Sequence, residues 1–207
     1  MKLQVAIDRV SLNEAEILVK TFDGLADIIE VGTSLIKDYG LLKLKDITRQ
    51  KNKSQILGDI KTSDEGAYEF EQGYKQGFDI LTVMGSASCK TIEKCYEVSE
   101  KYNKTMMIDL LECSDEKITE ISHFVNAIYC IHTSIDKESL SNPHEMVKVF
   151  KEKFPSIKRI AIAGGITLDS IEELNKSNIE IVIVGSAITS ADNKIEKINE
   201  FKGAINR

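Results

Sequence analysis

Eight short apolar runs recur along this chain at nearly regular intervals, and this repeat restricts the possible folds more than any other feature. The runs are rich in β-branched residues and span 3–7, 27–31, 55–60, 79–84, 105–110, 127–131, 159–163 and 180–184. Each has strand length, and nearly continuous hydrophobicity is typical of a parallel sheet that is covered on its outer face. Segments with helical periodicity separate the runs. The chain therefore alternates between strand and helix throughout.

The spacing of the runs predicts a closed barrel. The residues that mark the end of each run are 21 to 32 positions apart, so that each step is one βα unit. These landmarks are Asp8, Glu30, Asp59, Gly85, Asp109, His132, Gly164 and Gly185. Eight units are what a barrel of this class requires, whereas open doubly wound sheets have about five or six strands. We predict an α/β fold, a single (β/α)₈ TIM barrel over residues 1–207.

Composition agrees with one globular domain and disfavours two classes of partner, nucleic acids and membranes. Hydrophobic residues make up 42% of the 207 residues and charged residues 29%, which is ordinary for a packed domain. The net charge of −6 and the lack of a dense Lys/Arg block disfavour nucleic-acid binding. No run approaches the roughly 18 apolar residues of a membrane span, and no signal peptide opens the chain. We expect a cytoplasmic protein without a membrane partner.

The four cysteines form no pair with metal-binding or redox spacing. They are Cys89, Cys95, Cys113 and Cys130. Cys130 lies inside an apolar run, which is typical of a small buried side chain. We interpret all four as structural residues.

Ionisable residues gather at the ends of the predicted strands. The set is Asp8, Glu30, Asp59, Lys61, Asp109 and His132. The carboxyl ends of the strands of a barrel form one mouth, where barrel enzymes build their active sites. Any one of these residues could simply begin a solvated turn. Together they predict an active site, since so many ionisable groups at one mouth require partners, a metal or a substrate.

The segment 58–66 carries the most informative spacing. Asp59 and Lys61 are two residues apart on a predicted strand, so their side chains should point to the same side. An ammonium beside a carboxylate is suited to an oxyanion or to a metal-bound intermediate. Asp64 lies beyond the strand and could instead cap the next helix.

Three further features suggest ligands and chemistry. Glu30 and Asp59, on adjacent strands, suit a hard divalent cation such as Mg²⁺. His132 is the one histidine at a strand end, and an imidazole can move a proton near neutral pH. Two glycine-containing segments follow the last two strands, where barrels commonly bind phosphate, although they could serve only as tight turns. The residues of these segments are Gly164, Gly165, Gly185 and Ser186.

These residues also carry a family resemblance. The D-x-K-x-x-D pattern at Asp59, Lys61 and Asp64, with Asp8 and the segment 29–33, resembles the orotidine 5′-phosphate decarboxylase superfamily. Further segments at 82–85, 107–109, 131–133, 161–166 and 183–189 occur in the superfamily's order, so the resemblance covers essentially the whole chain. Within the superfamily the chain is similar to the 3-hexulose-6-phosphate synthases, with the 3-keto-L-gulonate-6-phosphate decarboxylases as near relatives.

The resemblance implies roles for individual residues. It implies that Glu30 and Asp59 bind Mg²⁺, with Mn²⁺ as an alternative, and that the metal polarises a ketone and stabilises an enediolate. Lys61 would add positive charge at the oxyanion. Asp8 and Asp109 would contact sugar hydroxyls, or position waters and Lys61. The resemblance also implies a homodimer in which Asp64 reaches the neighbouring site.

The implied reaction condenses formaldehyde with D-ribulose 5-phosphate, and the alternative is decarboxylation of 3-keto-L-gulonate 6-phosphate. Thr133 and Ile135 stand where the gulonate decarboxylases carry arginines, which favours the synthase reaction. Ser134 replaces the glycine that synthases usually have, and Ser186 replaces an arginine that many relatives carry after the last strand. The missing arginine disfavours orotidine monophosphate as the substrate. A barrel that binds a sugar phosphate without turnover is the non-enzymatic alternative.

Overall fold

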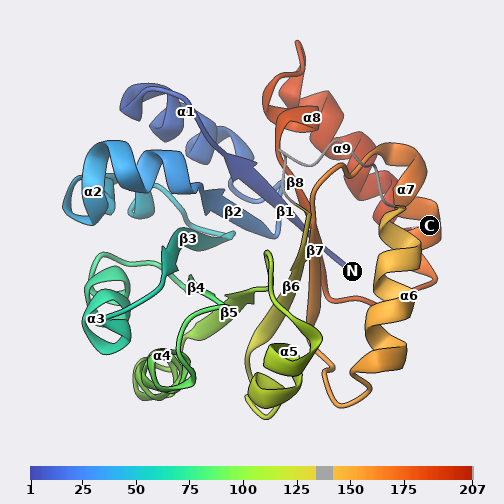
Figure 1. The fold of residues 1–207 in the computed structure, drawn as a ribbon. Coiled ribbons are helices and arrows are strands. Elements are labelled where there is room, and N and C mark those ends of the chain that lie inside the picture. Colours follow the sequence, from blue (N-terminus) through green and yellow to red (C-terminus); the bar gives the residue numbers. More distant parts are fainter. Residues whose placement is uncertain (134–141, 207) are drawn as a thin grey trace.

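Parallel strands close into a barrel in the order of the sequence. The computed structural model describes residues 1–133 and 142–206, and within these residues eight strands pair from β1 through to β8, with β8 pairing back to β1 (Figure 1). The strands are β1 Lys2–Ile7, β2 Ile28–Val31, β3 Gln55–Thr62, β4 Ile80–Met84, β5 Thr105–Asp109, β6 Ile128–His132, β7 Ile160–Ala163 and β8 Ile181–Val184. The predicted barrel is therefore confirmed.

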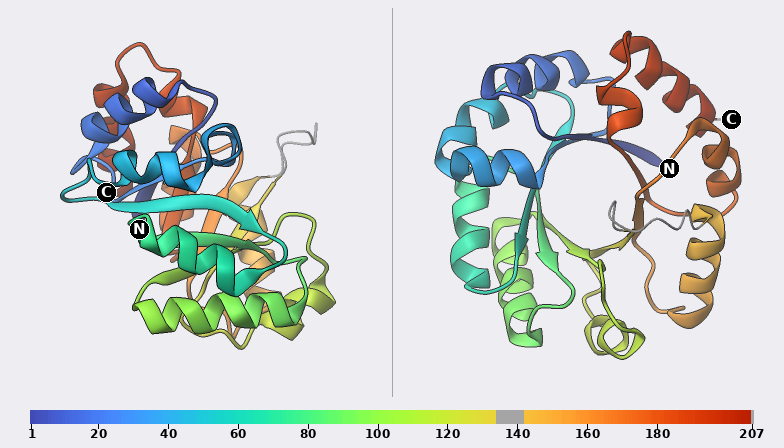
Figure 2. Two further views of the ribbon diagram at one scale, coloured as in Figure 1. Left: turned by 90° about the vertical axis from the view of Figure 1, so that its left-hand side faces the viewer. Right: turned by 45° about the horizontal axis from the view of Figure 1, so that its top comes forward.

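Helices surround the barrel on its outside (Figure 2). They are α1 Leu12–Phe22, α2 Thr33–Thr48, α3 Gly66–Lys75, α4 Cys89–Tyr102, α5 Asp115–Ile121, α6 Pro143–Lys153, α7 Leu168–Asn175, α8 Ser186–Thr189 and α9 Lys194–Ile205. Side-chain caps fix where several of them begin. The Ser11 hydroxyl accepts a hydrogen bond from the Glu14 amide at the start of α1, and Thr167 caps α7 in a reciprocal capping box.

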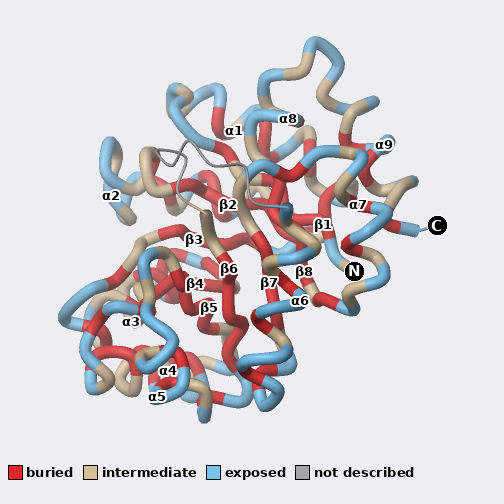
Figure 3. Tube along the Cα trace, turned by 45° about the vertical axis from the view of Figure 1, so that its right-hand side comes forward, coloured by how far each residue is buried: buried red, intermediate tan, exposed pale blue. Residues whose placement is uncertain are grey.

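The core has two layers, because each strand presents one face to the helices and the other to the barrel axis. The larger layer lies between sheet and helices, and Figure 3 shows buried strands inside a partly exposed outer ring. The smaller layer fills the barrel with Ile28, Leu57, Ile80, Met107, Ile128, Cys130, Ala161, Ile181 and Ile183. Apolar packing below leaves the carboxyl ends of the strands for polar side chains.

Strand β3 departs from regular geometry close to its end. Its pairing with β4 shifts register between Gly58 and Thr62, and Lys61 has a φ of 48°. A positive φ is uncommon for a residue with a side chain and is often found at functional sites. The strand also continues two residues beyond the predicted end at residue 60.

The first and last strands are joined at the opposite end of the barrel. The Lys2 amide donates to the carbonyl oxygen of Glu180 at 2.8 Å, and Lys202 on α9 donates to the Asp27 carboxylate at 2.7 Å. The same carboxylate accepts the Leu3 amide at 2.7 Å. The ladder between β1 and β8 closes the ring, and these contacts tie α9 and the start of β2 to the same end. In the part of the chain that is described, none of the helices is long and apolar enough to span a membrane.

Candidate active site

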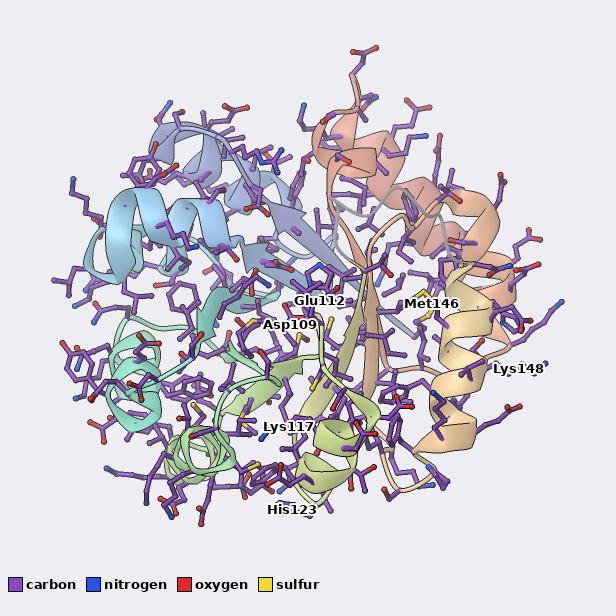
Figure 4. All side chains as sticks on the ribbon, viewed as in Figure 1. Asp109, Glu112, Lys117, His123, Met146 and Lys148 are labelled. Atoms are coloured by element: carbon purple, nitrogen blue, oxygen red, sulfur yellow. The ribbon has the colours of Figure 1, made fainter. Side chains whose placement is uncertain are left out.

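Five of the predicted residues lie together at the carboxyl end of the strands. They are Glu30 from β2, Asp59 and Lys61 from β3, Asp109 from β5 and His132 from β6. Figure 4 shows Asp109 at the end of β5, facing the middle of the ring of strands. Lys61, Asp109 and His132 form a continuous set of polar contacts, which Asp59 joins through Lys61.

Lys61 lies between two carboxylates. Its Nζ donates to Asp109 and is 3.2 Å from Oδ2 of Asp59. Burial alone would lower the pKa of Lys61, but the two carboxylates outweigh this effect and raise it above its ordinary value. The ammonium therefore stays charged at neutral pH, as stabilisation of an oxyanion requires.

The backbone that carries Lys61 to this position is not the regular strand that the spacing predicted. Regular alternation would bring Asp59 and Lys61 to the same side, yet the register shift interrupts alternation at this point. Thr82 on β4 bridges the irregularity: its hydroxyl accepts the Lys61 amide at 2.9 Å and donates to Oδ1 of Asp59 at 2.8 Å. The two side chains meet as expected, but through a bulged backbone that the spacing did not indicate.

Asp109 connects Lys61 to His132. The Nδ1 atom of His132 is 3.0 Å from both carboxylate oxygens, and the Leu111 amide donates to Oδ1 at 2.9 Å. Burial alone would raise the pKa of Asp109, but the hydrogen bond with His132 and the charge of Lys61 hold it at about 2. The carboxylate orients the imidazole by one nitrogen, and the His132 side chain remains 23% exposed.

Glu30 is a buried carboxyl group whose surroundings disfavour its charged form. Burial, followed by repulsion from Asp59, raises the pKa of Glu30 to about 8. The Gln4 amide donates to Oε2 of Glu30 at 2.6 Å, which opposes the rise. The carbonyl oxygen of the Gln4 side-chain amide, Oε1, is buried and has no hydrogen-bond partner among the described residues. Sequence reasoning missed Gln4, although an amide inside the apolar run 3–7 was a signal of a polar contact within the barrel.

The donor set fits a hard divalent cation. Glu30 and Asp59, on adjacent strands, could supply oxygen ligands, and a bound cation would offset the repulsion from Asp59, which adds to burial in raising the pKa of Glu30. Within residues 1–133 and 142–206, no group of three or more His, Cys, Asp or Glu side chains is arranged to bind a metal. Two carboxylates suit Mg²⁺, which usually keeps several waters and accepts substrate oxygens.

Asp8 has a role that the strand-end pattern did not indicate. Its Oδ1 accepts both the amide and the hydroxyl of Ser34, at 3.2 and 2.7 Å, in the first turn of α2. A Cβ at Gly32 would lie 2.2 Å from the Asp8 carboxylate, so only glycine leaves room for this contact. The ammonium of Lys61 contacts Asp59 and Asp109, so the structure does not support positioning of Lys61 by Asp8.

Asp64 lies apart from the cluster. It is exposed in the turn between β3 and α3. The alternative that it caps α3 is wrong, because Glu65 occupies the N-cap position and no side chain makes the cap hydrogen bond. Its exposure keeps it available to a second molecule.

The glycine segments after β7 and β8 have the backbone freedom that a close approach to an anion needs. Gly164 and Gly165 have φ values of 100° and 65°, and a Cβ at Gly164 would lie 2.9 Å from the carbonyl oxygen of Thr133. Gly185 immediately precedes α8, and Ser186 is exposed in its first turn. The residues predicted at 134–136 lie outside the described part of the chain.

Comparison with known proteins extends over nearly the whole chain. The sequence profile of the orotidine 5′-phosphate decarboxylase / HUMPS family matches residues 1–201. The 3-hexulose-6-phosphate synthase of Bacillus subtilis is 34% identical over 99% of both chains. The solved 3-hexulose-6-phosphate synthase from Salmonella typhimurium is 27% identical with a TM-score of 0.90, covering 100% of this chain and 99% of that one. The solved 3-keto-L-gulonate-6-phosphate decarboxylase from Vibrio cholerae has the same fold, with 21% identity and a TM-score of 0.86, covering 100% of this chain and 97% of that one.

Proposed function

This chain belongs to the orotidine 5′-phosphate decarboxylase / HUMPS family, and we propose that it condenses formaldehyde with D-ribulose 5-phosphate to give D-arabino-hex-3-ulose 6-phosphate. It is an enzyme of the carbon–carbon lyase type, acting on a sugar phosphate. The observation that carries the proposal is the contact series from Lys61 through Asp109 to His132 at the mouth of the barrel. Full-length similarity to the synthase of Bacillus subtilis supports it.

His132 is the proton-transfer group of this proposal. Asp109 holds Nδ1 of the imidazole, which leaves the other ring nitrogen to remove a proton from C1 of ribulose 5-phosphate. Removing that proton gives an enediolate, whose C1 then attacks the carbonyl carbon of formaldehyde. The ammonium of Lys61 stabilises the negative charge that develops on the substrate oxygen.

Glu30 and Asp59 would hold Mg²⁺ or Mn²⁺. When bound there, the cation supplies Lewis-acid chemistry at the substrate ketone. Asp59 also keeps Lys61 in place, at 3.2 Å. Glu30 needs the cation most, since burial and the charge of Asp59 raise its pKa to about 8.

The phosphate of the substrate would bind over β7 and β8. Backbone amides near Gly164, Gly165 and Gly185 are suited to this, and the hydroxyl of Ser186 would donate a further hydrogen bond. The sugar hydroxyls would then lie over the middle of the barrel mouth, within reach of Asp109 and of the second oxygen of Asp8.

Decarboxylation of 3-keto-L-gulonate 6-phosphate is the second candidate, because it also proceeds through an enediolate. Thr133 and Ile135 argue against it, since both arginines of those decarboxylases are absent and Ile135 cannot order a protonating water. The Thr133 hydroxyl instead donates to the sulfur of Met146 at 3.5 Å, away from the polar cluster.

The test supplies the protein with ribulose 5-phosphate, Mg²⁺ and formaldehyde and measures loss of formaldehyde. Without formaldehyde, the C1 proton of ribulose 5-phosphate should exchange with solvent, because enediolate formation precedes condensation. His132→Ala should depress exchange and condensation together, by about 10²-fold or more. Faster release of CO₂ from 3-keto-L-gulonate 6-phosphate would establish the second candidate. Tight sugar-phosphate binding without turnover would identify a binding protein.

A further inference from the structure

A lysine and a cysteine that the proposed reaction does not use are in direct contact outside the barrel. The Nζ of Lys117 on α5 is 2.6 Å from the Sγ of Cys89, the first residue of α4. Lys117 lies between α4 and α5 in Figure 4. Both side chains are only partly buried, and that of Lys117 is 20% exposed. A small solute can therefore reach the pair.

Two capped helix termini hold this contact in place. Ser88 accepts the Thr91 amide at 3.0 Å and fixes the start of α4. Ser114 accepts the amide of Lys117 itself at 3.2 Å and fixes the start of α5. Glu120, one turn further along α5, holds the ammonium of Lys117 at 3.3 Å. The two nucleophilic atoms are thus positioned before any reagent arrives. A carbon bound to one of them is therefore at high effective concentration for the other.

We propose that Lys117 and Cys89 form a capture site for formaldehyde, which joins their side chains through one methylene carbon. The separation of N and S is close to that of two atoms bonded to one tetrahedral carbon, so the bridge would require little movement. The proposal rests on the proposed function in one respect: formaldehyde reaches this protein because it is the proposed substrate.

The chemistry balances without an oxidant or a reductant. The Lys117 amine adds to the carbonyl carbon, forming a C–N bond, and the resulting hydroxymethylamine loses water to give an iminium ion. The sulfur of Cys89 then adds to that carbon, forming a C–S bond. The thiol proton leaves with the hydroxyl group as water. The sum is one amine, one thiol and one formaldehyde giving the N–CH₂–S bridge and one water.

Proximity rather than ionisation makes this pair reactive. Burial, with a hydrogen bond that the thiol donates to the Glu120 carboxylate, raises the pKa of the Cys89 thiol above its ordinary value. Contacts with Cys89 and Glu120 outweigh burial and raise the pKa of Lys117. Each group alone is therefore a slow nucleophile at neutral pH. Once one has reacted, the other is already beside the carbon, and the second step is intramolecular.

The bridge would connect the start of α4 with α5. It links residues 28 positions apart, across the segments that follow β4 and β5. Gly85 at the end of β4 donates its amide to the carbonyl oxygen of Asp109 at 2.7 Å. A covalent link here should raise the unfolding temperature, because it restricts the unfolded chain.

The test treats the full-length folded protein with a small molar excess of formaldehyde and then analyses the quenched digest by mass spectrometry. We expect a cross-linked pair of peptides that joins Cys89 to Lys117 and carries the mass of one added carbon atom. It should be at least about tenfold more abundant than any other lysine–cysteine pair, because of the preset contact. Protein unfolded before treatment should lose this preference.

Variants decide which atoms react. Cys89→Ser and Lys117→Gln should each abolish the bridge, whereas the matched control Cys113→Ser should retain it. Circular dichroism checks that each variant is folded. A bridge that is no more abundant than other pairs, or that persists in Cys89→Ser, would overturn the proposal.

Two measurements keep this site separate from the proposed function. The bridge should still form in His132→Ala, which lacks the proton-transfer group. Cys89→Ser should consume formaldehyde with ribulose 5-phosphate at the wild-type rate. If the protein forms the bridge but does not catalyse condensation, the proposed function fails and the capture site stands. If it catalyses condensation without the bridge, the reverse holds.

Discussion

At the scale of single residues, Glu30 shows what this site still requires. Burial and the neighbouring carboxylate both disfavour the charged form of Glu30. Its pKa of about 8 reflects the free-energy cost of ionising it there. Only the amide of Gln4 donates to it among the described residues, at 2.6 Å. A cation bound by Glu30 and Asp59 would remove the repulsion between the two carboxylates and stabilise the charged form of Glu30.

The first prediction concerns the pH dependence of stability without metal. Folded Glu30 holds its proton up to a pH of about 8, whereas the unfolded carboxyl releases it near 4.5. The folded state therefore binds more protons in this window, so the free energy of unfolding should fall as pH rises from 4.5 to 8. Chemical denaturation in EDTA at several pH values measures it.

Glu30→Gln is the control for this effect. The variant should remain folded, lose the fall in stability attributed to Glu30, and bind Mg²⁺ more weakly. EDTA should also abolish turnover by the wild type, and Mg²⁺ or Mn²⁺ should restore it. Full activity in excess chelator, or the same pH profile in the variant, would contradict the assignment of Glu30 as a metal ligand.

The second prediction concerns Asp109. Asp109→Asn removes the charge that holds both Lys61 and His132, so exchange of the C1 proton should slow by about 10²-fold. Asp115→Asn is the matched control, because Asp115 pairs with Lys153 on the surface at 2.5 Å. Equal exchange rates in the two variants would show that Asp109 does not orient the imidazole.

At the scale of elements, strand β3 separates what the sequence could predict from what it could not. All eight apolar runs became strands, because hydrophobic periodicity is set by burial on the outside of the sheet. The contact of Lys61 with Asp59 was also expected. The register shift beside it was not, since the hydrogen bonds that accompany it come from the hydroxyl of Thr82, a residue on another strand.

The same reasoning explains the other differences. Gln4 lies within an apolar run of the sequence. Its contact with Glu30 depends on the pairing of β1 with β2, which the run alone does not predict. Asp8 lies where a ligand-binding residue should lie, yet Ser34 from the following unit occupies one of its oxygens. Local pattern predicts where a strand ends, but it does not predict which neighbour a side chain meets there.

The third prediction tests the support that β4 gives to β3. Thr82→Val keeps the shape of the side chain but leaves the Lys61 amide and one oxygen of Asp59 without partners. We expect a loss of about 2 kcal/mol in the free energy of unfolding, together with lower activity. Thr82→Ser retains the hydroxyl and should lose much less of both. Thermal or chemical denaturation compares the two variants.

At the scale of the whole molecule, the proposed site lies at the carboxyl end of the strands, and the turn after β3 follows one of its strands. Asp64 is exposed in that turn and does not cap α3. We propose that the protein forms a homodimer in which Asp64 enters the site of the neighbouring molecule. The family's D-x-K-x-x-D pattern at residues 59–64 supports this proposal.

The fourth prediction follows from such an assembly. Lys61→Ala and Asp64→Asn should each inactivate the protein, but mixed dimers would contain one site with both residues intact. Co-expression of the two variants should therefore restore part of the activity, measured against each variant purified alone. A monomer in solution, or no recovery in verified mixed dimers, would refute the shared site.

The pairing of β8 with β1 has a consequence for how the protein is made. It joins segments that are synthesised far apart in time, as does the nearby contact of Asp27 with Lys202, residues 175 positions apart. While the ribosome is still producing the later units, β1 has an open edge and the polar site above it has no complete wall. Such an edge can pair with other nascent chains. We therefore expect one edge of β1 to stay unpaired during synthesis until β8 has been made.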